Sequence, residues 1–189
     1  YLEFSSLLTE PVEVKKLLEE MTQLSVLIWW HEREQKVLLK GLRFQQLIGP
    51  QINDSDGIIA ETVSVSEDVK ELNTQVWLYY DLQWPLANMA LLRSYRNVDV
   101  RANLDREQPE EYGKQYIRQL KTRWLPRSAA GVAVEVGRIL IRQYQDVRKA
   151  ISFAMDPKDD AYWVGDTVGV ATKYIQDYTG APAAKNYLI

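Results

Sequence analysis

The sequence feature that most constrains the fold is a change of hydrophobic period within residues 129–170. Small and apolar residues first recur there at spacings of three and four, as on one helix face: Ala130, Ala133, Val134, Gly137, Leu140, Ile141 and Tyr144. The period then falls to two, as in a strand, with Val147, Ile151, Phe153 and Met155 on one side and Arg148, Ser152 and Asp156 on the other. Residues 157–160 break this strand, and Val168 and Val170 resume the alternation after a turn at Gly165 and Asp166. This order predicts a helix whose small residues allow close packing against a sheet.

A second helix is predicted near the N-terminus. Thr9 or Glu10 can cap it, and Pro11 fits its first turn because that position needs no N–H. Its buried stripe is expected to be Val14, Leu17, Leu18, Met21 and Leu24, with Glu19, Glu20 and Gln23 in solvent. We therefore expect two main helices, over about 10–24 and 128–145.

Several segments have the composition of strands. We expect a hairpin from 25–30 and 36–44, a strand over 58–65, a single helical turn over 67–72, and a last hairpin around 177–180. Residues 116–125 fit either a helix, with Ile117, Leu120 and Trp124 on one face, or a strand, and we favour the strand. Residues 74–82 are apolar on both faces, which indicates a central strand. Residues 96–105 alternate. Their apolar set is expected to face inward (Val98, Val100, Ala102, Leu104) and their polar set outward (Asn97, Asp99, Arg101, Asn103, Asp105).

These elements interleave without a regular βαβ order, which predicts an α+β fold with mainly antiparallel sheets. We expect 189 residues to form one α+β unit. Within it, a small helix–hairpin lobe over 1–48 and a main lobe over 58–189 are possible divisions. Because the chain does not begin with Met and ends on the apolar Tyr187, Leu188 and Ile189, we expect it to be a fragment of a longer polypeptide.

Composition narrows the function classes. A hydrophobic fraction of 46% and a charged fraction of 26% are those of a globular protein. The longest apolar run, 26–30, is too short to span a bilayer, so no stable membrane insertion is expected. Zero cysteines exclude disulfides and thiolate metal sites. The net charge of −3 argues against tight nucleic-acid binding, which depends on phosphate neutralisation.

Segments along nearly the whole chain resemble, in the same order, the tail-hub and tail-tip (baseplate hub-like) proteins of long-tailed bacteriophages and prophages. The resembling segments are Leu17-Leu18-Glu19-Glu20, Val26-Leu27-Ile28-Trp29-Trp30-His31-Glu32, Gln35-Lys36-Val37, Val76-Trp77-Leu78-Tyr79-Tyr80, Pro109-Glu110-Glu111-Tyr112-Gly113, Arg123-Trp124-Leu125, Trp163-Val164-Gly165-Asp166-Thr167-Val168 and Thr179-Gly180-Ala181-Pro182. The order of helix, strand and Gly-Asp-hydrophobic motif is also similar to the tube-type domain that hub proteins share with tail-tube subunits.

The resemblance implies a structural role in the virion tail, with assembly in the bacterial cytoplasm. Hub proteins of this kind form trimeric rings that close the tail tube, contact tube and tape-measure proteins, and open for DNA ejection during host attachment. Expected partners are therefore copies of the same chain, those proteins, and genomic DNA only in passage. Six Trp and eleven Tyr are a generous supply of interface side chains. Asp99 and Asp105, if they faced a lumen, would repel DNA.

The candidate chemical groups favour no enzyme, cofactor or metal site. The single histidine, His31, lies beside Glu32 and Glu34 in a polar loop and is expected to be solvated. No Gly-x-Ser-x-Gly elbow exists. Asn53-Asp54-Ser55-Asp56-Gly57 hints at a calcium loop, but Ile52 and Val63 would occupy the first and last ligand positions, so a turn is expected. The same holds for Asp156, Asp159 and Asp160; Gly165 and Gly169 form no phosphate loop.

Two alternatives to a structural role stay open. One is a cell-wall-degrading hydrolase module of a virion, since two acids distant in sequence can meet in space as in carboxylate-pair glycosidases. The other is a module that binds a surface carbohydrate or a host protein.

Overall fold

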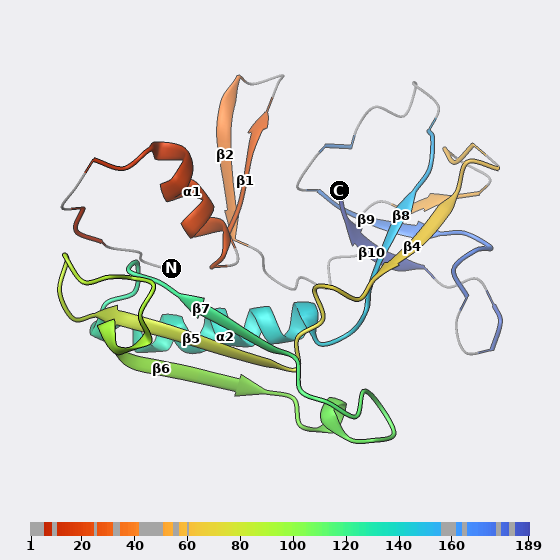
Figure 1. Cartoon of the computed structure of the whole chain (residues 1–189). Coiled ribbons are helices and arrows are strands. Elements are labelled where there is room, and N and C mark those ends of the chain that lie inside the picture. Colours follow the sequence, from red (N-terminus) through yellow and green to blue (C-terminus); the bar gives the residue numbers. More distant parts are fainter. Residues whose placement is uncertain are drawn as a thin grey trace. The chain divides into compact units, whose positions relative to one another are not determined.

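The computed structural model describes residues 6–8, 11–24, 26–31, 35–41, 51–54, 57–59, 61–155, 162–163, 166–176, 179–181 and 184–189 (Figure 1). Within these residues the fold is α+β, as predicted. Its two α-helices are α1 (Val14–Thr22) and α2 (Ala130–Tyr144), close to the predicted ranges. The strands are β1 (Val26–His31), β2 (Lys36–Gly41), β3 (Gln51–Asn53), β4 (Ser64–Asp68), β5 (Gln75–Leu82), β6 (Tyr95–Ala102), β7 (Ile117–Lys121), β8 (Arg148–Ser152), β9 (Thr167–Ala171) and β10 (Lys185–Leu188).

The chain divides into two compact units, Tyr1–Ile28 with Val69–Arg148 and Trp29–Asp68 with Lys149–Ile189. Each unit draws on both ends of its sequence range, so each is closed by contacts between residues far apart in the chain. The expected lobe over 1–48 stays a prediction, because much of that range lies outside the described residues.

The first unit is a three-stranded sheet with α2 along one face (Figure 1). The strand order is β6-β5-β7, with β5 antiparallel to β6 and parallel to β7. The predicted central position of residues 74–82 is therefore confirmed. The inward side chains of β5 and β7 meet α2 and the end of α1 in one buried cluster: Leu24, Val76, Leu78, Tyr80, Leu120, Leu125, Ala133, Val136, Leu140 and Ile141.

The second unit has its own sheet and its own core. β9 is the central strand, antiparallel to β10 and parallel to β3. Val168 and Val170 are buried in a cluster with Ile52, Ile58 and Ile175. Two further strand pairs, β1 with β2 and β4 with β8, complete the described sheets. The hairpin predicted from 25–30 and 36–44 is confirmed over residues 26–31 and 36–41.

Several local predictions were wrong at their boundaries. The strand expected over 58–65 is instead β4 at Ser64–Asp68, with Ile58 in a single bridge to Met155. That strand also replaces the first part of the helical turn expected over 67–72. The last hairpin was predicted within residues 172–189, but its first strand is β9 at Thr167–Ala171, which pairs antiparallel with β10 on the other side of the predicted turn. The turn of that hairpin, Asp177 and Tyr178, lies outside the described residues.

The N-terminal helix begins later than its sequence signals predict. Its N-cap is Glu13, whose side chain makes no capping hydrogen bond, and Pro11 precedes it. Thr9 and Glu10 lie outside the described residues. Val14, expected in the buried stripe, is exposed, whereas Leu24 just after the helix is fully buried. Burial of the helix therefore concentrates at its C-terminal end.

Candidate interaction surface

Strand β6 has the opposite orientation to the one predicted. Val98 and Val100 are 48% and 49% exposed, and Leu104 beyond the strand is 61% exposed. The side chain of Asp99, expected in solvent, is only 12% exposed. In the register of the sheet Val98 lies opposite Tyr79, and Val100 lies opposite Trp77. The apolar set of this strand therefore points away from α2.

Polar groups of β6 pack against the helix because α2 has a glycine there. A Cβ atom built on Gly137 would lie 3.0 Å from Cγ of Arg101 and 3.0 Å from Oδ2 of Asp99. The guanidinium of Arg101 donates two hydrogen bonds to the carboxylate of Asp99, at 2.8 and 2.7 Å. This contact raises the pKa of Arg101. The charges thus satisfy each other between strand and helix, and Asp99 is not available to line a channel.

We call the side of the sheet away from α2 the outward face, formed by Trp77, Tyr79, Val98, Val100 and Ile117. Strand alternation places Trp77 and Tyr79 there, because their neighbours Val76, Leu78 and Tyr80 are in the core. Both aromatic side chains are half-buried, and Ile117 is 43% exposed. The register of β5 with β7 also places the polar Gln119 and Lys121 on this side, opposite Trp77 and Tyr79. An ordinary one-sided sheet carries mainly polar side chains there, so the apolar side chains of β5 and β6 indicate a contact surface.

One end of the outward face is held by a network around Glu107. Its Oε1 accepts hydrogen bonds from the Thr74 hydroxyl at 2.7 Å and from Nε2 of Gln75 at 2.9 Å. Gln75 in turn accepts a hydrogen bond from the indole N–H of Trp77 at 3.0 Å. Thr74 is fully buried. This chain of bonds fixes the Trp77 ring and the loop that carries Glu107.

The opposite end of the sheet carries the apolar loop, residues 83–94, which joins β5 to β6. It is uncharged from Trp84 to Leu92, and four of its large apolar side chains are exposed: Trp84, Leu86, Leu91 and Leu92. Its polar groups are satisfied largely within the hairpin. Asn88 Oδ1 accepts from the Ala90 N–H at 2.9 Å, the Ser94 hydroxyl donates to the Asn88 carbonyl at 2.7 Å, and Gln83 Nε2 donates to the Arg93 carbonyl at 3.0 Å. The loop is therefore a shaped element that presents apolar side chains.

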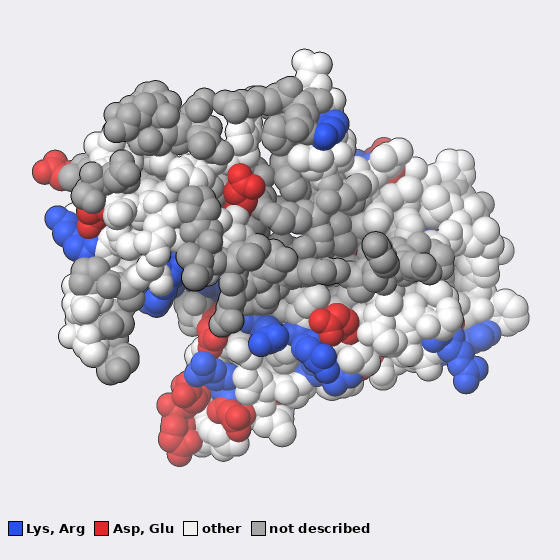
Figure 2. Space-filling model, turned by 180° about the vertical axis from the view of Figure 1, so that it is seen from behind, with Lys and Arg blue, Asp and Glu red and all other residues white. Residues whose placement is uncertain are grey.

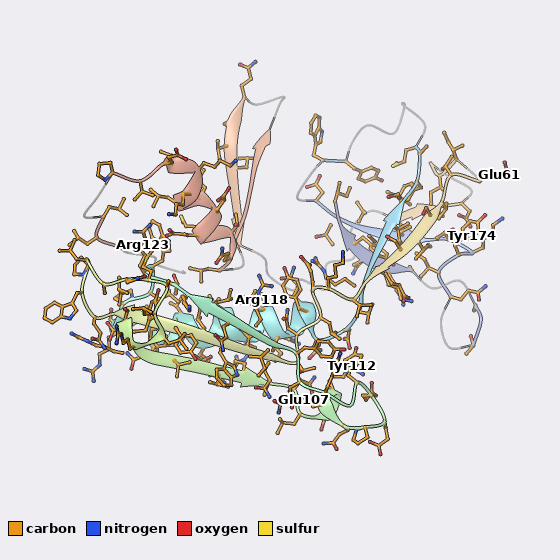
Figure 3. The ribbon with its side chains drawn as sticks, in the orientation of Figure 1. Glu61, Glu107, Tyr112, Arg118, Arg123 and Tyr174 are labelled. Atoms are coloured by element: carbon orange, nitrogen blue, oxygen red, sulfur yellow. The ribbon has the colours of Figure 1, made fainter. Side chains whose placement is uncertain are left out.

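Charge is separated along the same sheet. The exposed charged residues next to the apolar loop are basic: Arg93, Arg96 and Arg127. The acidic loop, residues 105–113, follows β6 at the other end and exposes Asp105, Glu110 and Glu111. Figure 2 shows acidic side chains gathered at the lower left, where this loop lies in the reversed view, and a basic group at the far right end. Figure 3 places Glu107 and Tyr112 at one end of the sheet and Arg123 at the other.

A hollow of about 330 Å³ lies beside the apolar loop and is lined by Asp81, Pro85 and Arg123 among others. Both charged groups are engaged. Asp81 Oδ2 accepts a hydrogen bond from Asn97 at 3.0 Å. Arg123 donates two hydrogen bonds, at 2.9 and 2.8 Å, to Glu20. Because both side chains are already paired, neither Asp81 nor Arg123 is a free acid or base in this hollow.

Glu20 was expected in solvent, and the structure corrects this. Besides Arg123, its carboxylate accepts a hydrogen bond from the indole N–H of Trp124 at 3.1 Å. Nearby, burial raises the pKa of Tyr95 to about 12, and the negative charge of Glu20 adds to the rise. The Tyr95 hydroxyl donates to the Met89 carbonyl at 3.1 Å. This cluster ties α1 to the end of the sheet that carries the apolar loop.

The candidate chemical groups of the sequence are only partly within the described residues. The backbone of His31 ends β1, but its side chain is not described, and Glu32, Glu34, Asp156, Asp159, Asp160 and Gly165 lie outside the described residues. Asp54 of the suspected calcium loop accepts a hydrogen bond from the Lys173 backbone N–H at 2.8 Å. Hydrogen bonds from Thr172 and Lys173 lower its pKa. Asp54 therefore holds the turn after β9; the turn expected over residues 53–57 stays a prediction, because residues 55 and 56 lie outside the described residues.

The described residues show neither a metal-binding cluster nor a membrane-spanning helix. No group of three or more His, Cys, Asp or Glu side chains among them is arranged to hold a metal ion. None of the described helices has the length and apolar character to cross a membrane. In comparison with known proteins, no protein-family model matches the chain, and no curated protein matches it either.

The sequence signal that could have revealed the surface is the pairing of Asp99 and Arg101 two positions apart on one strand face.

Proposed function

We propose that this chain is a structural component of a phage tail tip or baseplate hub. In this role it forms part of a ring that closes the tail tube and takes part in host attachment and DNA ejection. The observation that carries the proposal is the outward face, which leaves an apolar sheet surface and an apolar loop available to neighbouring subunits. The proposed partners are copies of the chain, tail-tube and tape-measure proteins, with DNA only in passage.

Two further features support this role. Three of the resembling segments fall in the first unit: Val76–Tyr80, 109–113 and 123–125. They supply its central strand, part of its acidic loop, and the side chains of Arg123 and Trp124 that bind Glu20. We propose a tube-type domain for the part of the chain in which α2 is followed by β8 and by the Gly-Asp-hydrophobic motif at residues 165–168; in sequence this order runs from the first unit into the second. A surface built for permanent contacts needs rigidity and apolar area more than it needs titratable groups.

Electron microscopy tests the proposal directly. Antibodies raised against the purified chain are expected to label one end of a phage tail in lysates from the bacterium that encodes it, and the purified protein is expected to form closed rings. A matched assay on bacterial cell walls should show no turnover. Labelling of heads or of no particle would contradict the structural role. Cell-wall hydrolysis that is lost on mutation of one acid pair would replace it with the hydrolase alternative.

A further inference from the structure

We propose that copies of this chain join head to tail, with the apolar loop of one copy docked on the outward face and acidic loop of the next. The inference rests on the proposed structural function and names the surfaces through which the copies meet. The occupant of the outward face is thus a second copy of the chain.

The two apolar surfaces of one copy differ in kind, since one is a loop and the other is the face of a sheet. The apolar loop projects its most exposed side chains, Trp84 at 67% and Leu86 at 76%, from one end of the hairpin. The outward face lies along the strands, and β6 alone spans about 26 Å at the usual rise per residue. Trp84 and Leu86 on the loop and Val98 and Val100 on the face are all exposed, so the two patches do not cover each other within one copy. They pair between copies in a heterologous contact, which closes into a ring when the rotation permits.

The apolar loop and the acidic loop carry opposite charges. Arg93 and Arg96 flank the apolar loop, and Asp105 and Glu110 flank the far end of the outward face. When the loop of one copy approaches the acidic loop of the next, opposite charges meet. In a symmetric contact of two apolar loops the same arginines would face each other and repel. Complementary charge therefore selects the head-to-tail arrangement and sets its register.

Several polar atoms of the apolar loop are already hydrogen-bonded within one copy. Its backbone carbonyls at Asn88, Met89 and Ala90 accept hydrogen bonds from Ser94, Tyr95 and Lys121 of the same unit. These groups are satisfied before any partner arrives, so docking does not leave them unpaired. A loop ordered in advance also loses little conformational freedom on binding. Trp84, a large and exposed aromatic side chain at the start of this loop, is the residue that contributes most to the contact.

The test is a mixing experiment on the whole purified chain, followed by sedimentation velocity at high micromolar concentration. The loop variant carries Trp84→Ser and Leu86→Ser, and the face variant carries Val98→Lys and Val100→Lys. Wild-type protein is expected to self-associate, and each variant alone to be monomeric. A mixture of the two retains one intact pair of surfaces and is expected to form one-to-one dimers. Trp84→Ala alone is expected to weaken association at least about 30-fold.

Controls separate misfolding from loss of contact. Val69→Lys changes an exposed valine that belongs to neither surface, at 53% exposure, and is expected to associate as wild type. Recovery of dimers in the mixture shows that each variant is folded. Arg93→Glu added to the face variant, or Glu110→Arg added to the loop variant, is expected to weaken the mixed dimer, and the two reversals together are expected to restore it.

The outcomes decide between the inference and the proposed function. Variants that assemble like wild type, a mixture that stays monomeric, or a monomeric wild type would each overturn the head-to-tail contact. If tail-end labelling by the antibody persists in any of these cases, the structural function stands and only the named surfaces fail. If labelling is absent while mixed dimers form, the contact stands and the phage-tail assignment fails.

Discussion

Replacement of Gly137 by alanine tests the reversed orientation of β6 most directly. Gly137 is buried in α2, and the added Cβ would lie 3.0 Å from both the Asp99 carboxylate oxygen and Cγ of Arg101. Gly131, on the same helix, is the matched control, because a Cβ there meets nothing within 4 Å. The two substitutions are chemically identical and differ in what the new methyl group touches.

The expected magnitudes follow from two opposing effects. An alanine in place of a helical glycine stabilises a helix by up to about 1 kcal/mol. Overpacking a filled site costs about 1–3 kcal/mol. Gly131→Ala is therefore expected to raise the free energy of unfolding, by up to about 1 kcal/mol, with less gain the closer the site is to the helix start. Gly137→Ala is expected to lower it by roughly 0–2 kcal/mol, because the Asp99–Arg101 pair must shift to admit the methyl group.

The measurement is urea unfolding of both variants, read from the midpoint at an unchanged slope. A second variant, Asp99→Ala, removes the oxygen that the new Cβ meets. In a double-mutant cycle Gly137→Ala should then cost less in the Asp99→Ala background than in wild type, by roughly 0.5–3 kcal/mol. Equal stabilisation by both glycine substitutions, or zero coupling with Asp99, would refute the placement of the polar side of β6 against α2.

Three further predictions concern single groups. Burial raises the pKa of Tyr95 from 10.0 to about 12. The stability that its protonated side chain contributes is therefore complete below pH 10 and is lost as the pH rises to 12. In an absorbance titration, Tyr95→Phe should lack the highest tyrosine step. The lowered pKa of Asp54 stabilises the fold above its ordinary value of 3.8 and less as the pH falls below it; Asp54→Asn should therefore destabilise at neutral pH, with the gap to wild type closing in acid. Glu20→Ala should cost about 2 kcal/mol in urea unfolding, because it leaves Arg123 and Trp124 without their acceptor, whereas the exposed Glu19→Ala should be nearly neutral.

The sequence was sufficient for elements whose pattern is set by their own burial. Residues 74–82 are apolar on both faces, and the structure places them between two strands and under a helix. The periodic face of α2 is likewise confirmed at Ala133, Gly137, Leu140 and Ile141, although Val136 also joins the core. In both cases hydrophobic period and tertiary burial agree.

The sequence did not predict which side chains are buried where a charged group finds its partner elsewhere in the fold. Alternation in 96–105 shows that β6 has one apolar and one polar face, but not which face the helix covers. That depends on Gly137, some 36 positions away, and on the ability of Asp99 and Arg101 to satisfy each other. Glu20 was wrongly predicted to lie in solvent for the same reason. Its carboxylate accepts hydrogen bonds from Arg123 and Trp124, which are far away in the sequence. Contacts with residues so distant in the chain leave no local periodic signal.

The orientation of β6 connects the fold to the proposed assembly. Full burial of a valine side chain is worth about 1.5–3 kcal/mol, so half-exposed Val98 and Val100 each forgo roughly 1 kcal/mol in the isolated unit. Within the described residues β6 is also an edge strand, and charged side chains that point inward, here Asp99 and Arg101, are a device that discourages pairing with a further strand. The strand therefore disfavours lateral addition at its edge and offers apolar area on its face. A neighbour that covers that face recovers the burial without extending the sheet, which is the kind of contact that a head-to-tail ring requires.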